Sequence, residues 1–142
     1  MKISVFELAY RYVYPSVKKR LVEILHGEHG LSQWRISKLL YMDQSTVSRY
    51  IGRERGVLID LSRYRDVDIL LHRYADTIVK ENPDKYKLMK DLVKITLWIM
   101  GRGYICGYHR ELDDSVEVSK CGICLHLFRG FNVDDESHGR EA

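Results

Sequence analysis

The chain has 142 residues, which is enough for one domain or for a small domain with a short accessory module. Hydrophobic residues make up 45% and charged residues 30% of it. No apolar run is long enough for a membrane span, and the N-terminus has neither the apolar core nor the cleavage site of a secretory signal peptide. We therefore expect a cytoplasmic protein. The net charge is +3, but residues 1–56 carry ten Lys or Arg against five Asp or Glu, and this basic excess favours phosphate binding by the N-terminal part.

Helical spacing of apolar residues marks the first part of the chain. Residues 5–13 are apolar enough to pack on a core and are expected to form a short helix. Pro15 suits the first turn of the next helix, because its missing N–H would have no partner there. Apolar residues then follow at helical spacing, namely Val17, Leu21, Ile24 and Leu25. Gly27 and Gly30 are expected to end this helix.

A pair of short helices joined by a tight turn is expected next. Ser32 and Asp43 are the expected N-caps of the two helices, and Tyr41–Asp43 forms the turn. Ser37 supplies the small side chain that two steeply crossing helices need where they touch. The inward-facing set consists of Ile36, Leu39, Leu40, Met42, Val47, Tyr50 and Ile51. Tyr41 stands where the chain tends to adopt a positive φ, at a cost of about 1 kcal/mol.

The outer side of the second helix is short and polar, as a helix that enters the major groove requires. Base contacts are expected from Gln44, Ser45, Thr46 and Arg49, with Ser48 on the same helix. Phosphate contacts, which fix the register without reading sequence, are expected from Ser32, Gln33, Lys38, Arg53 and Arg55. Trp34 suits either a groove-side contact or packing. A buried helical hairpin that binds no nucleic acid is the alternative interpretation.

Three stretches of this region carry a family resemblance: Tyr12-Val13-Tyr14-Pro15 leading into a helix, Leu31-Ser32-Gln33 followed by Ile36-Ser37-Lys38-Leu39-Leu40, and Gln44-Ser45-Thr46-Val47-Ser48-Arg49-Tyr50-Ile51. Residues 12–56 thereby resemble the Cro/C1-type helix-turn-helix of archaeal transcriptional regulators. The resemblance implies a DNA-binding transcription factor, usually a dimer. Members of that family often end in a Cys-x-x-Cys element, and this chain has one at Cys121 and Cys124.

Two long helices are expected in residues 57–103. The first carries apolar residues at helical spacing from Val67 to Ile78 and ends at Asn82-Pro83. The second runs from about Lys85 to Met100 and is apolar around most of its circumference, which is more than a helix lying singly on a small domain needs. We therefore expect a second subunit to cover part of it, so that this region serves dimerisation.

The three cysteines and His109 form two short pairs near the C-terminal end, Cys106-x-x-His109 and Cys121-x-x-Cys124. Two such pairs supply the four ligands of a closed, structural zinc site. The segment between the two pairs is long enough for a hairpin. Residues 104–131 are therefore expected to form a small zinc-knuckle or ribbon-like module. Three alternatives stay open: His126 in place of His109, a disulfide or redox pair of Cys121 and Cys124, and an iron–sulfur cluster held by the cysteines.

The sequence thus predicts a mostly α protein made of a helix-turn-helix domain (1–56), a helical dimerisation region (57–103), a metal module (104–131) and a disordered tail (132–142). The acidic pair Asp113-Asp114 is expected to be solvated surface. No phosphate-binding loop, dinucleotide fingerprint or His-Glu-x-x-His motif occurs, so no enzyme is expected. The expected function is sequence-specific transcriptional regulation, with residues 43–51 reading double-stranded DNA. The alternative is a protein-interaction adaptor with a structural metal knuckle.

Overall fold

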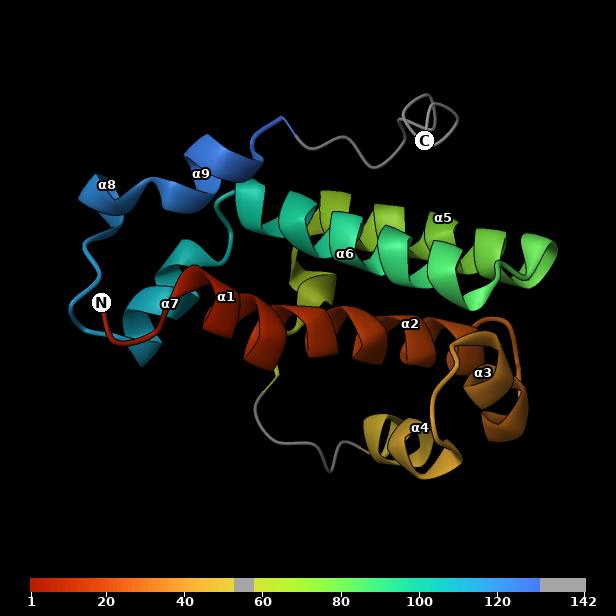
Figure 1. Ribbon diagram of the computed structural model, residues 1–142. Coiled ribbons are helices and arrows are strands. Elements are labelled where there is room, and N and C mark those ends of the chain that lie inside the picture. The colour runs from red at the N-terminus through yellow and green to blue at the C-terminus, as the bar shows by residue number, and fades with distance from the viewer. Residues whose placement is uncertain (53–57, 131–142) are drawn as a thin grey trace.

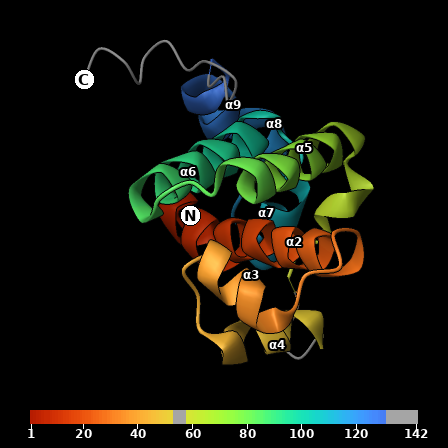
Figure 2. The same ribbon diagram turned by 90° about the vertical axis from the view of Figure 1, so that its right-hand side faces the viewer.

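The structure is a computed structural model that describes residues 1–52 and 58–130. Every regular element within these ranges is helical, which confirms the expected mostly α fold. Among these helices, none is long and apolar enough to cross a membrane. One long helix runs through the middle of the molecule, with α3 and α4 on one side of it and α5 and α6 on the other (Figures 1 and 2).

This central helix is built from α1 (Val5–Leu8), a π-helical turn η1 (Ala9–Val13) and α2 (Tyr14–Gly27). The residues at the joints keep right-handed helical backbone angles, so the three segments are continuous. The short helix expected in residues 5–13 is therefore present, but as the first part of a longer one. Pro15 lies in the first turn of α2, directly after the π turn, and Ser16 Oγ donates a hydrogen bond to the Tyr12 carbonyl at 2.6 Å.

The expected helix pair is formed by α3 (Gln33–Leu39) and α4 (Gln44–Ile51). Ser32 caps α3, because its Oγ accepts the Arg35 N–H at 3.1 Å. Tyr41 has φ of 54°, which confirms the left-handed turn expected there. Asp43 occupies the N-cap position of α4 with extended backbone angles, but its carboxylate makes no capping hydrogen bond, so that part of the expectation is wrong.

Replacing Ser32 with alanine is expected to lower the free energy of unfolding by about 1 kcal/mol, because it leaves a backbone N–H in the first turn of α3 without its acceptor. Thermal unfolding monitored by circular dichroism measures this loss. Ser48→Ala is the matched control, since Ser48 is exposed in the interior of α4 and should change the stability by less than about 0.5 kcal/mol. An S32A chain as stable as the parent would show that the cap contributes nothing.

The second half of the chain begins with a short 3-10 turn, η2 (Leu61–Arg63), followed by α5 (Arg65–Glu81) and α6 (Lys85–Gly101). The ends of α5 and α6 agree with the expected ones, and Asn82, with φ of 45°, terminates α5 just before Pro83. Tyr74 on α5 donates a hydrogen bond to Asp91 Oδ2 on α6 at 2.8 Å. The long helices are thus joined by a polar contact as well as by packing.

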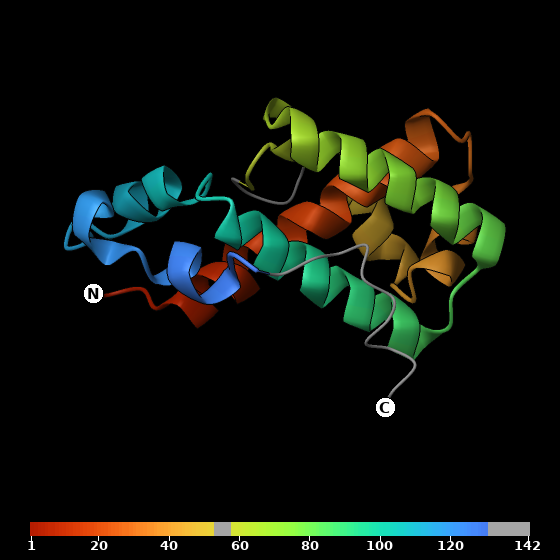
Figure 3. The same cartoon turned by 90° about the horizontal axis from the view of Figure 1, so that it is seen from above.

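The C-terminal segment consists of α7 (Cys106–Leu112), α8 (Val118–Cys121) and α9 (Ile123–Phe128). The hairpin expected between the Cys106/His109 pair and the Cys121/Cys124 pair is wrong, because the described chain there is helical at both ends and contains no strand. α9 packs on the C-terminal half of α6 (Figure 3), and α7 lies beside α1 (Figure 1). The expected tail, residues 132–142, lies outside the described residues.

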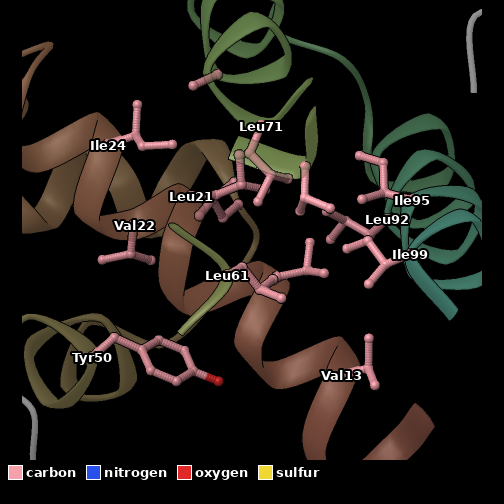
Figure 4. Packing of buried hydrophobic residues seen from close by; sticks show 14 of the residues in the cluster. Val13, Leu21, Val22, Ile24, Tyr50, Leu61, Leu71, Leu92, Ile95 and Ile99 are labelled. Carbon is pink, nitrogen blue, oxygen red and sulfur yellow. The ribbon is translucent and has the colours of Figure 1, made fainter. Parts of the chain in front are cut away.

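The core is one buried cluster that extends from Leu8 to Cys124. Leu21 of α2 points toward Leu71 of α5, and Ile95 and Ile99 of α6 lie on the same side (Figure 4). Tyr50 of α4 is buried on another side of α2. Opposite faces of the same helix therefore hold the α3–α4 pair and the α5–α6 pair in place.

Histidine–carboxylate pairs join the loop after α2 to α5. His72 Nε2 lies 2.8 Å from Glu28 Oε2, and its Nδ1 lies 2.8 Å from the Asp68 carbonyl oxygen. His29 Nε2 lies 3.1 Å from Asp76 Oδ1. The hydrogen bond to the Asp68 carbonyl is the largest effect on the pKa of His72 and raises it; burial opposes this increase, and the carboxylates of Glu28 and Asp68 add to it, so that the pKa lies above the ordinary histidine value. The folded state therefore stabilises the protonated imidazole relative to the unfolded chain.

Because the pKa of His72 is raised in the folded state, its contribution to stability is fully present below the ordinary histidine value and is lost as the pH rises through the folded value. The parent chain should therefore be more stable than a His72→Gln variant at about pH 5.5, by less than about 1 kcal/mol, since the pair is partly exposed. The difference should shrink by about pH 8.5. Denaturant unfolding at both pH values tests this, and a difference that grows with pH would contradict it.

Candidate functional site

Helix α4 lies at one edge of the molecule, on the side of α2 opposite to α5 and α6 (Figures 1 and 2). Its inner side is anchored by Val47 and Tyr50, which are both 0% exposed and pack toward α2 and α3. The other side of the helix exposes polar side chains, namely Gln44, Ser45, Ser48 and Arg49. A helix held firmly along one side and open along the other has the form needed to enter a groove.

Most of the residues expected to contact bases are thus brought together on one exposed surface, and Thr46 is half-buried at its border. The Arg49 side chain folds back along its own helix. Its Nε lies 3.4 Å from the Ser45 carbonyl oxygen, and one terminal nitrogen lies 3.5 Å from Thr46 Oγ1. Hydrogen bonds of this length are weak, so the guanidinium can exchange them for a base edge at little cost.

The residues expected to contact phosphates are placed less uniformly. Lys38 is exposed, and its ammonium lies 5.6 Å from the centre of the Trp34 ring, which is 57% exposed. Trp34 is therefore a surface residue rather than a packing residue. Ser32 is exposed but uses its hydroxyl as the α3 cap, and Gln33 is half-buried. Arg53 and Arg55 lie outside the described residues.

Two features of this surface were missed from the sequence. Arg35 is exposed on α3, and a helical projection from Ser32 onward would have placed it on the outer side. Tyr41 donates a hydrogen bond to the Pro83 carbonyl at 3.0 Å, so the turn of the helix pair is fastened to the loop between α5 and α6. This hydrogen bond helps to offset the cost of a positive φ at Tyr41, but no local sequence signal predicts it.

The second cluster of interest is the set of cysteines at the other end of the molecule. All three are free thiols, and Cys106, Cys121 and Cys124 line one apolar cavity of about 10 Å³. His109 lines it too, whereas His126 is exposed and takes no part. The fold thus gathers the four expected ligands at one place. Within residues 1–52 and 58–130, however, no group of three or more His, Cys, Asp or Glu side chains is arranged to hold a metal ion.

Burial sets the protonation of these thiols. It raises the pKa of Cys124 to about 11, with smaller contributions from Cys106 and Cys121. Burial, and then the neighbouring Cys121, also raise the pKa of Cys106. At neutral pH both groups are protonated, and only a bound cation that replaces the protons would make them thiolates.

Residues beside the cavity hold the N-terminus of the chain. His109 is 3% exposed, and its Nε2 lies 2.7 Å from the Ile3 carbonyl oxygen, to which it donates. Asp113 Oδ2 accepts the backbone N–H groups of Lys2 and Ile3. Hydrogen bonds from Ser115 and from this backbone lower the pKa of Asp113. The expectation that Asp113 is solvated surface is therefore wrong, since the residue is 1% exposed.

Comparison of the chain with protein-family models, with curated proteins and with solved structures found no match. The likeness of residues 12–56 to the Cro/C1-type helix-turn-helix stays a resemblance of sequence motifs. Function is therefore inferred from the geometry of α3 and α4 and from the cysteine cavity.

Proposed function

We propose that the protein is a sequence-specific DNA-binding transcriptional regulator that places α4 in the major groove. One observation carries the proposal: α4 is anchored by Val47 and Tyr50 and exposes a short polar side that includes Gln44 and Arg49. The positive φ of Tyr41 and the buried Ser37, 7% exposed where the helices meet, support the same interpretation.

The exposed side chains suit the chemistry of base edges. A glutamine such as Gln44 can pair with adenine through two hydrogen bonds, and an arginine such as Arg49 with guanine. Lys38 and Arg35, exposed on α3, suit phosphate contacts that position the helix without reading sequence. The basic excess of residues 1–56 would then supply the salt-dependent part of the affinity.

A homodimer is part of the proposal. The N-terminal half of α6 exposes apolar side chains that the described residues leave uncovered, namely Tyr86 (78%), Met89 (54%) and Val93 (45%). A symmetric dimer would present two α4 helices to successive major-groove segments about 34 Å apart. Sedimentation at several protein concentrations tests this point.

The same exposed side of α6 favours the alternative function, a protein-interaction adaptor that docks another chain. The C-terminal helices would in either case carry a metal, for which zinc is the proposed cofactor and an iron–sulfur cluster the alternative. The three thiols at one cavity support a metal of this soft kind. Elemental analysis with a visible spectrum of anaerobically purified protein separates zinc, which is colourless, from iron.

Selection from a pool of random duplexes tests the function itself. A regulator of the proposed kind should enrich a motif with two related half-sites, as expected for a symmetric dimer. An adaptor should enrich nothing, and a pool that stays random after several rounds at low salt would overturn the proposal.

A further inference from the structure

We propose that Cys106, Cys121 and Cys124 bind one soft metal cation through three thiolates, and that this binding alters how the C-terminal helices hold the N-terminal end of the central helix. The inference rests on the proposed function, because it assumes that α3 and α4, which pack against the central helix, bind DNA.

The three thiols are assigned as ligands because they line one cavity. The three thiols come from α7, α8 and α9 and share a space of about 10 Å³, which is close to the volume of one small occupant. His109 donates through Nε2 to the Ile3 carbonyl, which leaves Nδ1 as its one possible ligand atom, so the His109→Gln variant below decides whether the histidine takes part. Binding of a divalent cation releases one proton from each of the three thiols, and nothing is oxidised or reduced. Thiolates select soft cations such as Zn²⁺ or Cd²⁺ over hard ones.

Binding must move part of the C-terminal segment. No three of the candidate side chains in the described residues stand at ligating positions, so the thiols have to converge when a cation enters. Each thiol belongs to a different helix. Convergence therefore shifts these short helices relative to one another.

Movement of the C-terminal helices would also move the N-terminus, because the two are in contact. His109 and Asp113 hold the backbone of Lys2 and Ile3, and Leu8 of α1 forms part of the cavity wall. From α1 the chain stays helical to Gly27, a rise of about 35 Å. Its far end packs against α3 and α4. The π-helical turn Ala9–Val13 lies between the two sites, and such turns within α-helices are frequent at functional sites.

The ligand set is tested by cadmium titration of the reduced full chain, followed by the ultraviolet absorption of cadmium–thiolate bonds. One Cd²⁺ per chain is expected. Cys124→Ser should weaken binding by about tenfold or more, because one of only three ligands is lost. His109→Gln should retain the parent affinity within about threefold, since glutamine still donates to the Ile3 carbonyl. Equal losses in the two variants would make the histidine a ligand and overturn the three-thiolate site, as would no binding by the parent.

The coupling is tested by hydrogen exchange of the amides in residues 2–10 and by DNA affinity, each with and without Cd²⁺. In the parent chain both should change, the affinity by about tenfold. Asp113→Asn should still bind Cd²⁺ within about threefold but show a smaller change in both, because its side chain holds Lys2 and Ile3 less firmly. At a Cd²⁺ concentration that occupies the parent chain but not the weaker-binding C124S chain, C124S should respond in neither.

Cadmium binding that leaves the exchange of residues 2–10 unchanged would overturn the coupling. A chain that shows the exchange response but binds no DNA with or without Cd²⁺ would refute the proposed function. The same result would still support the metal site and its coupling to the backbone of residues 2–10. The two failures are therefore distinguishable.

Discussion

Replacing Arg49 with alanine is expected to weaken binding to the selected duplex by roughly 1–3 kcal/mol and to relax the base preference at one position of each half-site. Arg49 is exposed near the middle of the polar side of α4, where a guanidinium can reach the two acceptors of guanine. Its hydrogen bonds within the helix are long, so the free energy of unfolding should change by less than about 0.5 kcal/mol. Fluorescence anisotropy with the selected duplex and with single-base variants measures both effects.

Lys38→Ala is the matched control, because Lys38 is also an exposed cation of the helix pair but lies on α3. Its loss should weaken all duplexes about equally and reduce the slope of log affinity against log salt by about 1. The contrast between the two variants separates base reading from phosphate contact. If R49A keeps both the affinity and the base preference of the parent, α4 does not read bases through this residue.

Gly101→Ala is expected to destabilise the chain by about 1–3 kcal/mol. Gly101 ends α6, where α9 crosses it closely. A Cβ atom at this position would lie 2.5 Å from the Phe128 carbonyl oxygen and 2.7 Å from its carbon. Both are backbone atoms and cannot rotate away, so α9 has to move. The gain of up to about 1 kcal/mol from the helix propensity of alanine is too small to offset this clash.

Gly107→Ala provides the control for Gly101. Gly107 lies in α7 and has no atom within 4 Å of the position of a Cβ. The substitution should leave the stability unchanged or raise it by less than about 1 kcal/mol. Denaturant unfolding of the two variants side by side gives the comparison. Equal stabilities would show that the contact between α6 and α9 yields easily, and that α9 is not held where the structure places it.

The parts of this fold that could be predicted from sequence are those decided by neighbouring residues. Asn82 and Pro83 stop α5 because a left-handed residue and a proline cannot continue a helix. The start of α3 follows from Ser32 as a cap, and the buried and exposed sides of α4 follow from the spacing of Val47 and Tyr50. These signals need no knowledge of the rest of the chain.

The sequence-based predictions that were wrong concern residues whose contacts lie far away in the sequence. Asp113 looks like one of a pair of solvated acids, but its partners are the backbone groups of Lys2 and Ile3. The length of the segment between the Cys106/His109 pair and the Cys121/Cys124 pair favours a hairpin, whereas the chain there forms α7 and α8. The hydrogen bond from the Tyr41 hydroxyl to the Pro83 carbonyl also joins residues that lie far apart in the sequence. Only the assembled core brings such groups together.

Sequence reading by α4 is tested by the salt dependence of affinity for the selected duplex and for a scrambled duplex of the same composition. Log affinity for both should fall linearly with log salt, as expected when lysine and arginine side chains displace counterions. The selected duplex should bind about 10³-fold more tightly or better at physiological salt. Equal affinities for the two duplexes, or no binding even at low salt, would contradict the claim that α4 reads DNA sequence.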